Sequence, residues 1–114
     1  MSYLIHIIEK FELMIVIIDY GIGNVKSVLN ALDYIGAKAI ITRDNDIIKK
    51  ASGLILPGVG AFSEGIRRLK KYDLIDSISK SCINGKPLLG ICLGFQMLMN
   101  SSTENGYNKG LSFL

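Results

Sequence analysis

The chain has 114 residues and a formal net charge of +3, with 49% hydrophobic and 20% charged residues. This length and balance are typical of one folded domain with its own core, and the scattered lysines and arginines argue against nucleic acid as a partner. The two cysteines form no C-x-x-C pair and have no histidine near them, so a zinc site is not expected.

Residues 1–13 are interpreted as an N-terminal extension, because Met14 opens a clean strand pattern. The extension carries Glu9, Lys10 and Glu12, which disqualify it as a signal peptide, and no apolar run is long enough to span a bilayer. An additional N-terminal helix is the alternative interpretation. Two cysteines without a signal peptide predict a reducing cytoplasm, with no membrane partner.

Strand and helix patterns alternate from Met14 onward. The β-branched run at 14–18 predicts a buried strand, and Asn24 is expected to cap a helix over 25–35 that ends at Gly36. One apolar stripe of this helix is made of Val25, Val28, Leu29, Leu32 and Ile35.

The rest of the chain continues this alternation. In chain order we expect a strand over 37–42, a short helix capped by residues 44–46 and ending near Ala51, a strand over 53–56, one or two helices over 62–82 with Ser63 as the N-cap, and a strand over 87–91. The expected fold class is therefore α/β, a doubly wound, mostly parallel sheet with helices on both faces. Ligands bind such sheets beyond the carboxyl ends of the strands, where the loops 19–24, 57–60 and 90–94 should meet.

The segment Gly90-Ile91-Cys92-Leu93-Gly94 joins the last predicted strand to an amphipathic run. G-x-C-x-G in this setting is the thiol form of a nucleophile elbow, whose flanking glycines permit a tight turn beside a helix N-terminus. Buried cysteines are usually inert, and Cys82 is interpreted in that way, whereas the position of Cys92 predicts a nucleophile for acyl transfer. Gln96 shares the helix face of Cys92 and is either a substrate contact or a solvated residue.

Two glycine-bearing loops are the other candidates. The N–H groups of Pro57-Gly58-Val59-Gly60, with that of Leu93, would form an oxyanion hole, and the alternative is a plain turn that begins a helix. Gly21-Ile22-Gly23 lacks the third glycine of a dinucleotide fingerprint, since Lys26 stands there. A turn that another backbone or a ligand can approach is the favoured interpretation.

Three motifs in this order and spacing resemble those of the class I (triad-type) glutamine amidotransferases, and among these the glutaminase subunits of imidazole glycerol phosphate synthase. They are the runs Met14 to Asn24, Leu56 to Phe62 and Gly90 to Gln96. The resemblance extends from Met14 to about Leu114. It implies a flavodoxin-like α/β fold, with residues 14–114 forming the N-terminal part of an amidotransferase domain. A relative that amidates a sugar in surface-polysaccharide synthesis shares these motifs, and membership of that group is the alternative interpretation.

The resemblance also implies a chemistry, with no cofactor. Cys92 would attack the side-chain amide of glutamine, which gives a thioester and releases ammonia. The other implied roles are backbone N–H donors to the oxyanion from Gly58, Val59 and Leu93, shaping of that loop by Gly60, and binding of the glutamine substrate by Gln96.

A partner is implied by the same resemblance. The loop with Tyr20, Gly21 and Asn24 would lie near the interface with a (β/α)₈ cyclase subunit, in a cytoplasmic heterodimer. That subunit would use the ammonia to make imidazole glycerol phosphate in histidine biosynthesis.

One departure from the family pattern is large. The family's catalytic histidine and glutamate lie well downstream of the cysteine, whereas the single histidine here, His6, precedes the first strand. We therefore expect a truncated chain that does not turn over glutamine alone, because no base serves Cys92. The competing interpretations are a catalytically dead binding module that docks on the cyclase, and a small cysteine hydrolase or chaperone. The latter usually has histidine where Leu93 stands.

Overall fold

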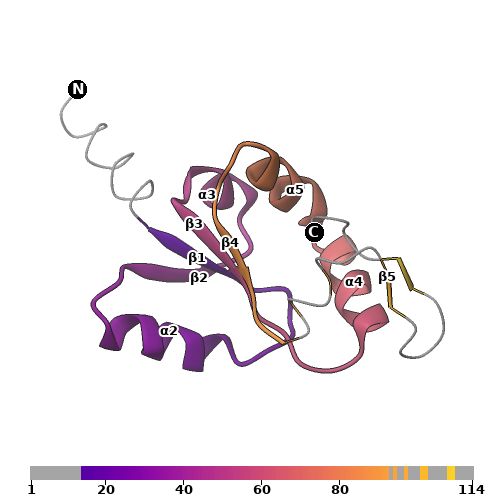
Figure 1. The fold of residues 1–114 in the computed structure, drawn as a ribbon, viewed down its shortest axis with the longest axis horizontal. Coiled ribbons are helices and arrows are strands. Elements are labelled where there is room, and N and C mark those ends of the chain that lie inside the picture. Colours follow the sequence, from indigo (N-terminus) through magenta and orange to yellow (C-terminus); the bar gives the residue numbers. More distant parts are fainter. Residues whose placement is uncertain (1–13, 93, 95–96, 98–100, 103–107, 110–114) are drawn as a thin grey trace.

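The computed structural model describes residues 14–92, 94, 97, 101–102 and 108–109. Its main sheet has four parallel strands in the order β2-β1-β3-β4 (Figure 1). The strands are β1 (Ile15–Ile18), β2 (Ala39–Thr42), β3 (Gly53–Leu56) and β4 (Leu88–Gly90). The chain steps outward from β1 to β2 and then returns past β1 to β3 and β4, so the expected doubly wound α/β fold is confirmed.

Helices cover both faces of this sheet (Figure 1). They are α2 (Val25–Tyr34), α3 (Asn45–Lys50), α4 (Phe62–Lys71) and α5 (Ile75–Ile83). The predicted helical region 62–82 thus consists of two helices. A separate antiparallel pair, β5 (Ser101–Ser102) and β6 (Asn108–Lys109), follows later in the chain.

The main core lies between the sheet and helices α3, α4 and α5. Alternate strand residues face this side, and Val16, Ile18, Leu54 and Leu56 are all at most 2% exposed. They pack in one cluster with helix residues such as Phe62. Burial of these large apolar side chains is the main stabilising contribution to the fold.

The opposite face is covered less completely. Helix α2 lies against β1 and β2, yet it has no buried residue. The predicted apolar stripe is wrong at its last position, because Ile35 follows the final turn of α2 and is 72% exposed. Beside Leu32, the same face holds an apolar hollow of about 300 Å³ that extends to Leu89 on β4.

Two helix caps form as predicted and one does not. The Asn24 side chain accepts a hydrogen bond of 3.1 Å from the Ser27 N–H, and Asp44 accepts one of 2.9 Å from Asp46. Ser63 is not a cap, because α4 begins after Ala61, which makes no side-chain cap bond. Within the described residues, no helix is both long and apolar enough to cross a membrane. The expected extension, residues 1–13, lies outside them.

Candidate functional site

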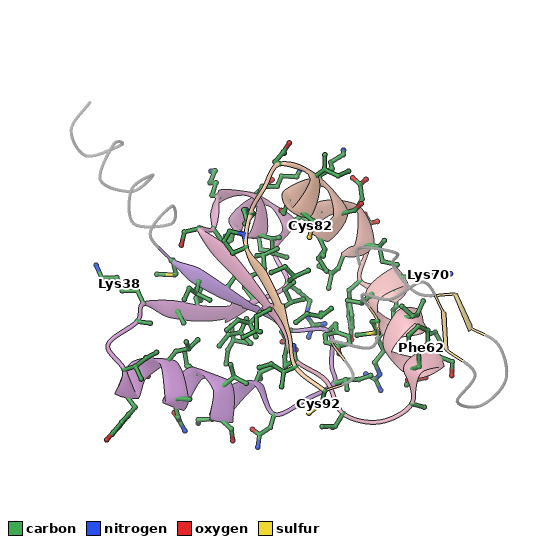
Figure 2. The ribbon with its side chains drawn as sticks, in the orientation of Figure 1. Lys38, Phe62, Lys70, Cys82 and Cys92 are labelled. Carbon is green, nitrogen blue, oxygen red and sulfur yellow. The ribbon has the colours of Figure 1, made fainter. Side chains whose placement is uncertain are left out.

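Three loops meet beyond the carboxyl ends of β1, β3 and β4. The N–H of Ile91 donates a hydrogen bond of 3.0 Å to the carbonyl oxygen of Leu56, so the turn after β4 is tied to the end of β3. The loop after β1 packs on the loop after β3, because a Cβ atom on Gly23 would lie only 3.1 Å from the Gly58 nitrogen. The sheet edge predicted to carry a site therefore assembles as expected, with Cys92 at this end (Figure 2).

Cys92 occupies a strained backbone position. Its φ is 52°, in the left-handed region that non-glycine residues rarely adopt, and the residue is exposed. Such strain at a strand-to-helix turn is typical of a nucleophile elbow. Gly94 is buried, and a Cβ atom there would lie 1.8 Å from the carbonyl oxygen of Leu56. The second glycine of the motif thus lets the turn lie directly against the end of β3.

The loop after β3 offers backbone donors beside this turn. Gly58 is buried, whereas Val59 is 62% exposed and Gly60 is exposed with a φ of 104°. Within the described part of the chain, the N–H groups of these three residues donate to no acceptor. Free N–H groups in a glycine-bearing loop can stabilise an oxyanion.

Tyr20 connects two of the loops from inside the protein. Its side chain is completely buried, and its hydroxyl donates a hydrogen bond to the carbonyl oxygen of Pro57. Burial raises the pKa of this hydroxyl, which stays protonated and remains a donor. The Tyr20 side chain thus faces the interior, and the interface role that the resemblance implies for its loop stays a prediction. Gly21 and Asn24 are exposed, and their interface role stays a prediction.

Two predicted site residues, Leu93 and Gln96, lie outside the described residues. Their roles in oxyanion and substrate binding therefore stay predictions. The structure places their neighbours Gly94 and Met97 in helical conformation, and both are buried.

A polar network that the sequence analysis missed holds the loop after β1. An Asp19 carboxylate oxygen accepts a hydrogen bond of 3.3 Å from the Gly21 N–H, and the other pairs with Arg43 at 3.0 Å. The Arg43 guanidinium lies 4.0 Å from the centre of the Tyr72 ring and lowers the pKa of that phenol. Asp19 and Arg43 each follow the end of a predicted strand, and this shared position was the available signal.

Arg68 supports the same loop from helix α4. A Cβ atom on Gly21 would lie 2.5 Å from a guanidinium nitrogen of Arg68, so the side chain rests on this glycine. Glu64 accepts a hydrogen bond of 2.9 Å from Arg68 and further bonds from Arg67. These arginines lower the pKa of Glu64 to about 2. Arg67 and Arg68 on α4 thus both form ion pairs within the protein.

Cys82 has the surroundings of a packing residue. It lies on α5, far from Cys92 in Figure 2, and contacts the main core. Burial raises the pKa of its thiol, which lowers the fraction of reactive thiolate.

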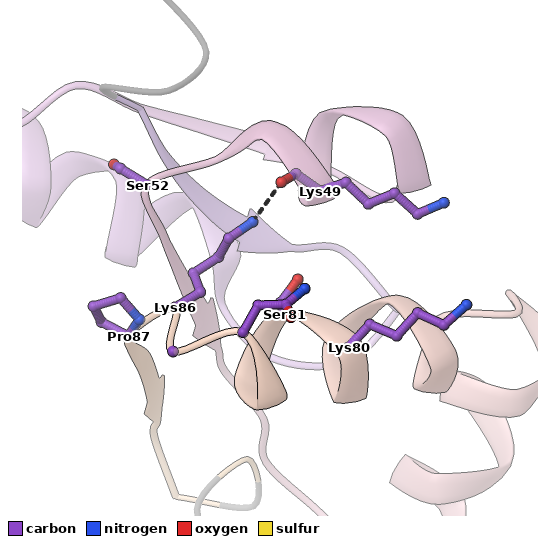
Figure 3. A pocket seen from close by; sticks show the side chains of 8 residues that line it. Lys49, Ser52, Lys80, Ser81, Lys86 and Pro87 are labelled. Carbon is purple, nitrogen blue, oxygen red and sulfur yellow. Dashed lines mark hydrogen bonds between the residues drawn. The ribbon is translucent and has the colours of Figure 1, made fainter.

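A cavity of about 500 Å³ lies at the opposite end of the sheet, near the starts of β3 and β4 (Figure 3). Lys86 lines this cavity, and its ammonium group donates hydrogen bonds to the carbonyl oxygens of Ile48 (2.6 Å) and Lys49 (2.8 Å). These carbonyls belong to the last turn of α3, where the negative end of the helix dipole favours a cation. The cavity therefore has a structural explanation, and it is remote from Cys92. No group of three or more potential metal-ligating side chains occurs among the residues the structure describes.

Comparison with known proteins identifies relatives for most of the chain. Residues 16–111 match the family described as glutamine amidotransferase class-I. The imidazole glycerol phosphate synthase subunit HisH 2 of Methanococcus maripaludis is 55% identical over 102 residues, which cover 89% of this chain and 50% of the relative. The HisH subunit of Bacillus cereus (strain G9842) is 50% identical over 101 residues, 89% of this chain and 48% of the relative.

A solved structure supports the same fold. The crystal structure of a glutamine amidotransferase superposes with a TM-score of 0.70 at 23% identity, over 84% of this chain and 51% of that chain. The chain spans about half the length of the curated relatives that it matches.

Proposed function

Since the chain belongs to the class-I glutamine amidotransferase family, we propose that it is the cysteine-bearing N-terminal half of a glutaminase subunit of imidazole glycerol phosphate synthase. The observation that supports this most directly is the position of Cys92. The residue is exposed and has a positive φ, and the N–H of Ile91 just before it is hydrogen-bonded to the end of β3, where the loop with Gly58–Gly60 begins. HisH subunits about 50% identical to this chain also support it.

The proposed reaction begins at the Cys92 sulfur. The thiolate attacks the side-chain amide carbon of glutamine, and the amide oxygen becomes an oxyanion. The N–H groups of Gly58 and Val59, with that of Leu93, stabilise this charge, which is usually the largest electrostatic contribution to acyl transfer. Collapse of the tetrahedral intermediate breaks the C–N bond and releases ammonia, and water then hydrolyses the thioester to glutamate.

Two proton transfers need a group other than Cys92. The leaving ammonia must gain a proton and the attacking water must lose one. The described residues place no histidine beside Cys92, and His6 lies outside them. We therefore propose that a polypeptide of these 114 residues alone can be alkylated at Cys92 by a chloroketone, which expels chloride and needs no proton donor, but does not turn over glutamine.

We further propose that the ammonia passes to a (β/α)₈ cyclase subunit. Gly21 and Asn24 form the exposed part of the loop after β1, and this loop packs on the loop that carries the proposed oxyanion donors. Binding of the cyclase there would place the acceptor of ammonia next to its source.

Covalent labelling tests the proposed nucleophile. The probe is the chloroketone analogue of glutamine, in which a –CH₂Cl group replaces the amide nitrogen; the thiolate bonds to that carbon and chloride leaves. We expect peptide mapping to find the label on Cys92, at a rate well above that of chloroacetone and reduced by added glutamine. Cys82→Ser is the matched control, and its Cys92 should be labelled at the wild-type rate. Equal rates with both chloroketones, without protection by glutamine, would contradict the proposed function.

A further inference from the structure

Tyr20 is a buried polar group that the proposed reaction does not use. It directly follows Asp19 after β1, and its hydroxyl reaches the carbonyl oxygen of Pro57, 37 positions along the chain. The side chain is 0% exposed, so water cannot replace this hydrogen bond. A bond of this kind joins the loop after β1 to the first residue of the loop after β3.

The geometry of the peptide bond gives this contact a consequence for the site. All described peptide bonds are trans, and in a trans peptide the C=O and N–H groups point in opposite directions. When Tyr20 fixes the Pro57 carbonyl, it also fixes the direction of the Gly58 N–H. That N–H has no acceptor within the described residues.

Gly23 keeps the space beside this N–H open. A Cβ atom at Gly23 would lie 3.1 Å from the Gly58 nitrogen and 3.3 Å from its Cα atom. Tyr20 and Gly23, three residues apart in one loop, therefore act on the same peptide group: Tyr20 holds its carbonyl, and Gly23 leaves its nitrogen uncrowded.

We propose that Tyr20 is a positioning residue, whose buried hydroxyl holds the Pro57–Gly58 peptide so that the loop after β3 presents its N–H groups to the oxyanion formed at Cys92. This inference rests on the function proposed above. It assigns Tyr20 no contact with the substrate, and its effect is transmitted through the orientation of one peptide plane.

The test compares Tyr20→Phe with the wild-type chain and with Tyr34→Phe, a matched change at a side chain that is 92% exposed. Two reagents report on Cys92. The glutamine chloroketone needs its carbonyl oxygen polarised by the loop, whereas the disulfide 5,5′-dithiobis(2-nitrobenzoate) reacts at sulfur and needs no oxyanion donor. Circular dichroism verifies that each variant is folded.

We expect Tyr20→Phe to slow labelling by the chloroketone at least about tenfold, because loss of one oxyanion donor typically slows acyl transfer about 100-fold or more. The disulfide rate should stay within about twofold, since access to the thiol is unchanged. Tyr34→Phe should change neither rate. An equal fall with both reagents, or no fall with either, would overturn the assignment. An unfolded Tyr20→Phe chain would overturn it too, because the hydroxyl would then serve folding and not loop placement.

Amide order parameters from nuclear magnetic resonance separate this inference from the proposed function. We expect the order parameters of the Gly58–Gly60 amides to fall in Tyr20→Phe, because the loop loses its anchor, and to stay unchanged in Tyr34→Phe. If wild-type Cys92 shows no preference for the glutamine chloroketone, the proposed function fails, and the order parameters alone then decide the role of Tyr20. Unchanged order parameters across Gly58–Gly60 would overturn it.

Discussion

The backbone N–H of Ile91 donates a 3.0 Å hydrogen bond to the carbonyl oxygen of Leu56. This bond continues the β3–β4 ladder by one step, after Leu56 has paired with Gly90. It places the residue before Cys92 beside the residue before Pro57, so the nucleophile turn and the glycine-bearing loop start from the same point of the sheet. The candidate site is thus a direct consequence of parallel strand pairing.

Gly94→Ala should be strongly destabilising. The added Cβ atom would lie 1.8 Å from the carbonyl oxygen of Leu56, so backbone must shift, which costs more than moving a flexible side chain. We expect the free energy of unfolding to fall by about 3 kcal/mol, the upper end for overpacking. Urea unfolding followed by circular dichroism measures this change.

Gly53→Ala is the matched control, because its Cβ atom would meet its nearest neighbour at an ordinary 3.7 Å. It should change the free energy of unfolding by less than about 1 kcal/mol. Similar midpoints for the two variants would mean that the turn does not lie against β3 as described.

Comparison of Gly23→Ala with Gly36→Ala should separate the effect of backbone strain from the effect of crowding the loop after β3. Gly23 has a φ of 94° and Gly36 a φ of 78°, so alanine costs about 1–2 kcal/mol of stability at either position. A Cβ atom at Gly23 would crowd the Gly58 nitrogen, whereas one at Gly36 meets nothing within 4 Å.

Only Gly23→Ala should therefore slow labelling of Cys92 by the glutamine chloroketone, and Gly36→Ala serves as the control for strain. The rates are compared under conditions in which both variants remain folded. Equal labelling rates would show that the space beside Gly58 is irrelevant to the reaction at Cys92.

Local patterns predicted most of the secondary structure. The strands β1 to β4 begin and end within two residues of the predicted positions, because β-branched and leucine-rich runs are bounded by residues that stop them. The caps at Asn24 and Asp44 were equally visible, since a cap depends on residues two or three positions away. The predicted cap at Ser63 was wrong because α4 begins after Ala61, so Ser63 lies within the helix.

Contacts between distant residues were not predictable in this way. The Tyr20–Pro57 bond joins residues 37 positions apart, and the Arg43–Asp19 pair joins residues 24 apart. Both depend on which strands become neighbours, and local periodicity does not encode that order. Ile35 illustrates a related limit: a helical stripe identifies residues on one side of a helix, but not whether another element covers them.

Cys82 should react with thiol reagents only at higher pH than a solvent-exposed cysteine. Burial raises the pKa of its thiol, and only the thiolate is nucleophilic, so its rate should rise at a higher pH when folded than when unfolded. The measurement is the pH dependence of iodoacetamide alkylation in a Cys92→Ala variant, with and without urea. Identical pH profiles in the two states would contradict the buried environment assigned to Cys82.

Glu64 should make the stability of helix α4 sensitive to acid. Hydrogen bonds from Arg67 and Arg68 lower its pKa to about 2 from an ordinary value of 4.5. A carboxyl group whose pKa is lowered by folding stabilises the folded state above the unfolded-state pKa and loses this contribution as the pH falls through the folded value. Between pH 4.5 and 2, wild type should therefore lose more stability than Glu64→Gln.

Urea midpoints at pH 6 and pH 3 measure this difference, which added salt should reduce because the carboxylate is partly exposed. Asp76→Asn is the control, since Asp76 pairs with Lys80 at 3.1 Å and both side chains are more than 60% exposed, so this pair contributes little to stability. The stability that Asp76→Asn loses between pH 6 and pH 3 should be close to the wild-type loss.

Glu64→Gln should also loosen the loop after β1, because Glu64 holds Arg68 and Arg68 rests on Gly21. This contact links an ion pair on the helix surface to the candidate site. We expect faster amide exchange at residues 21–23 in Glu64→Gln but not in Asp76→Asn. Equal exchange in both variants would show that the Glu64–Arg68 pair does not support this loop.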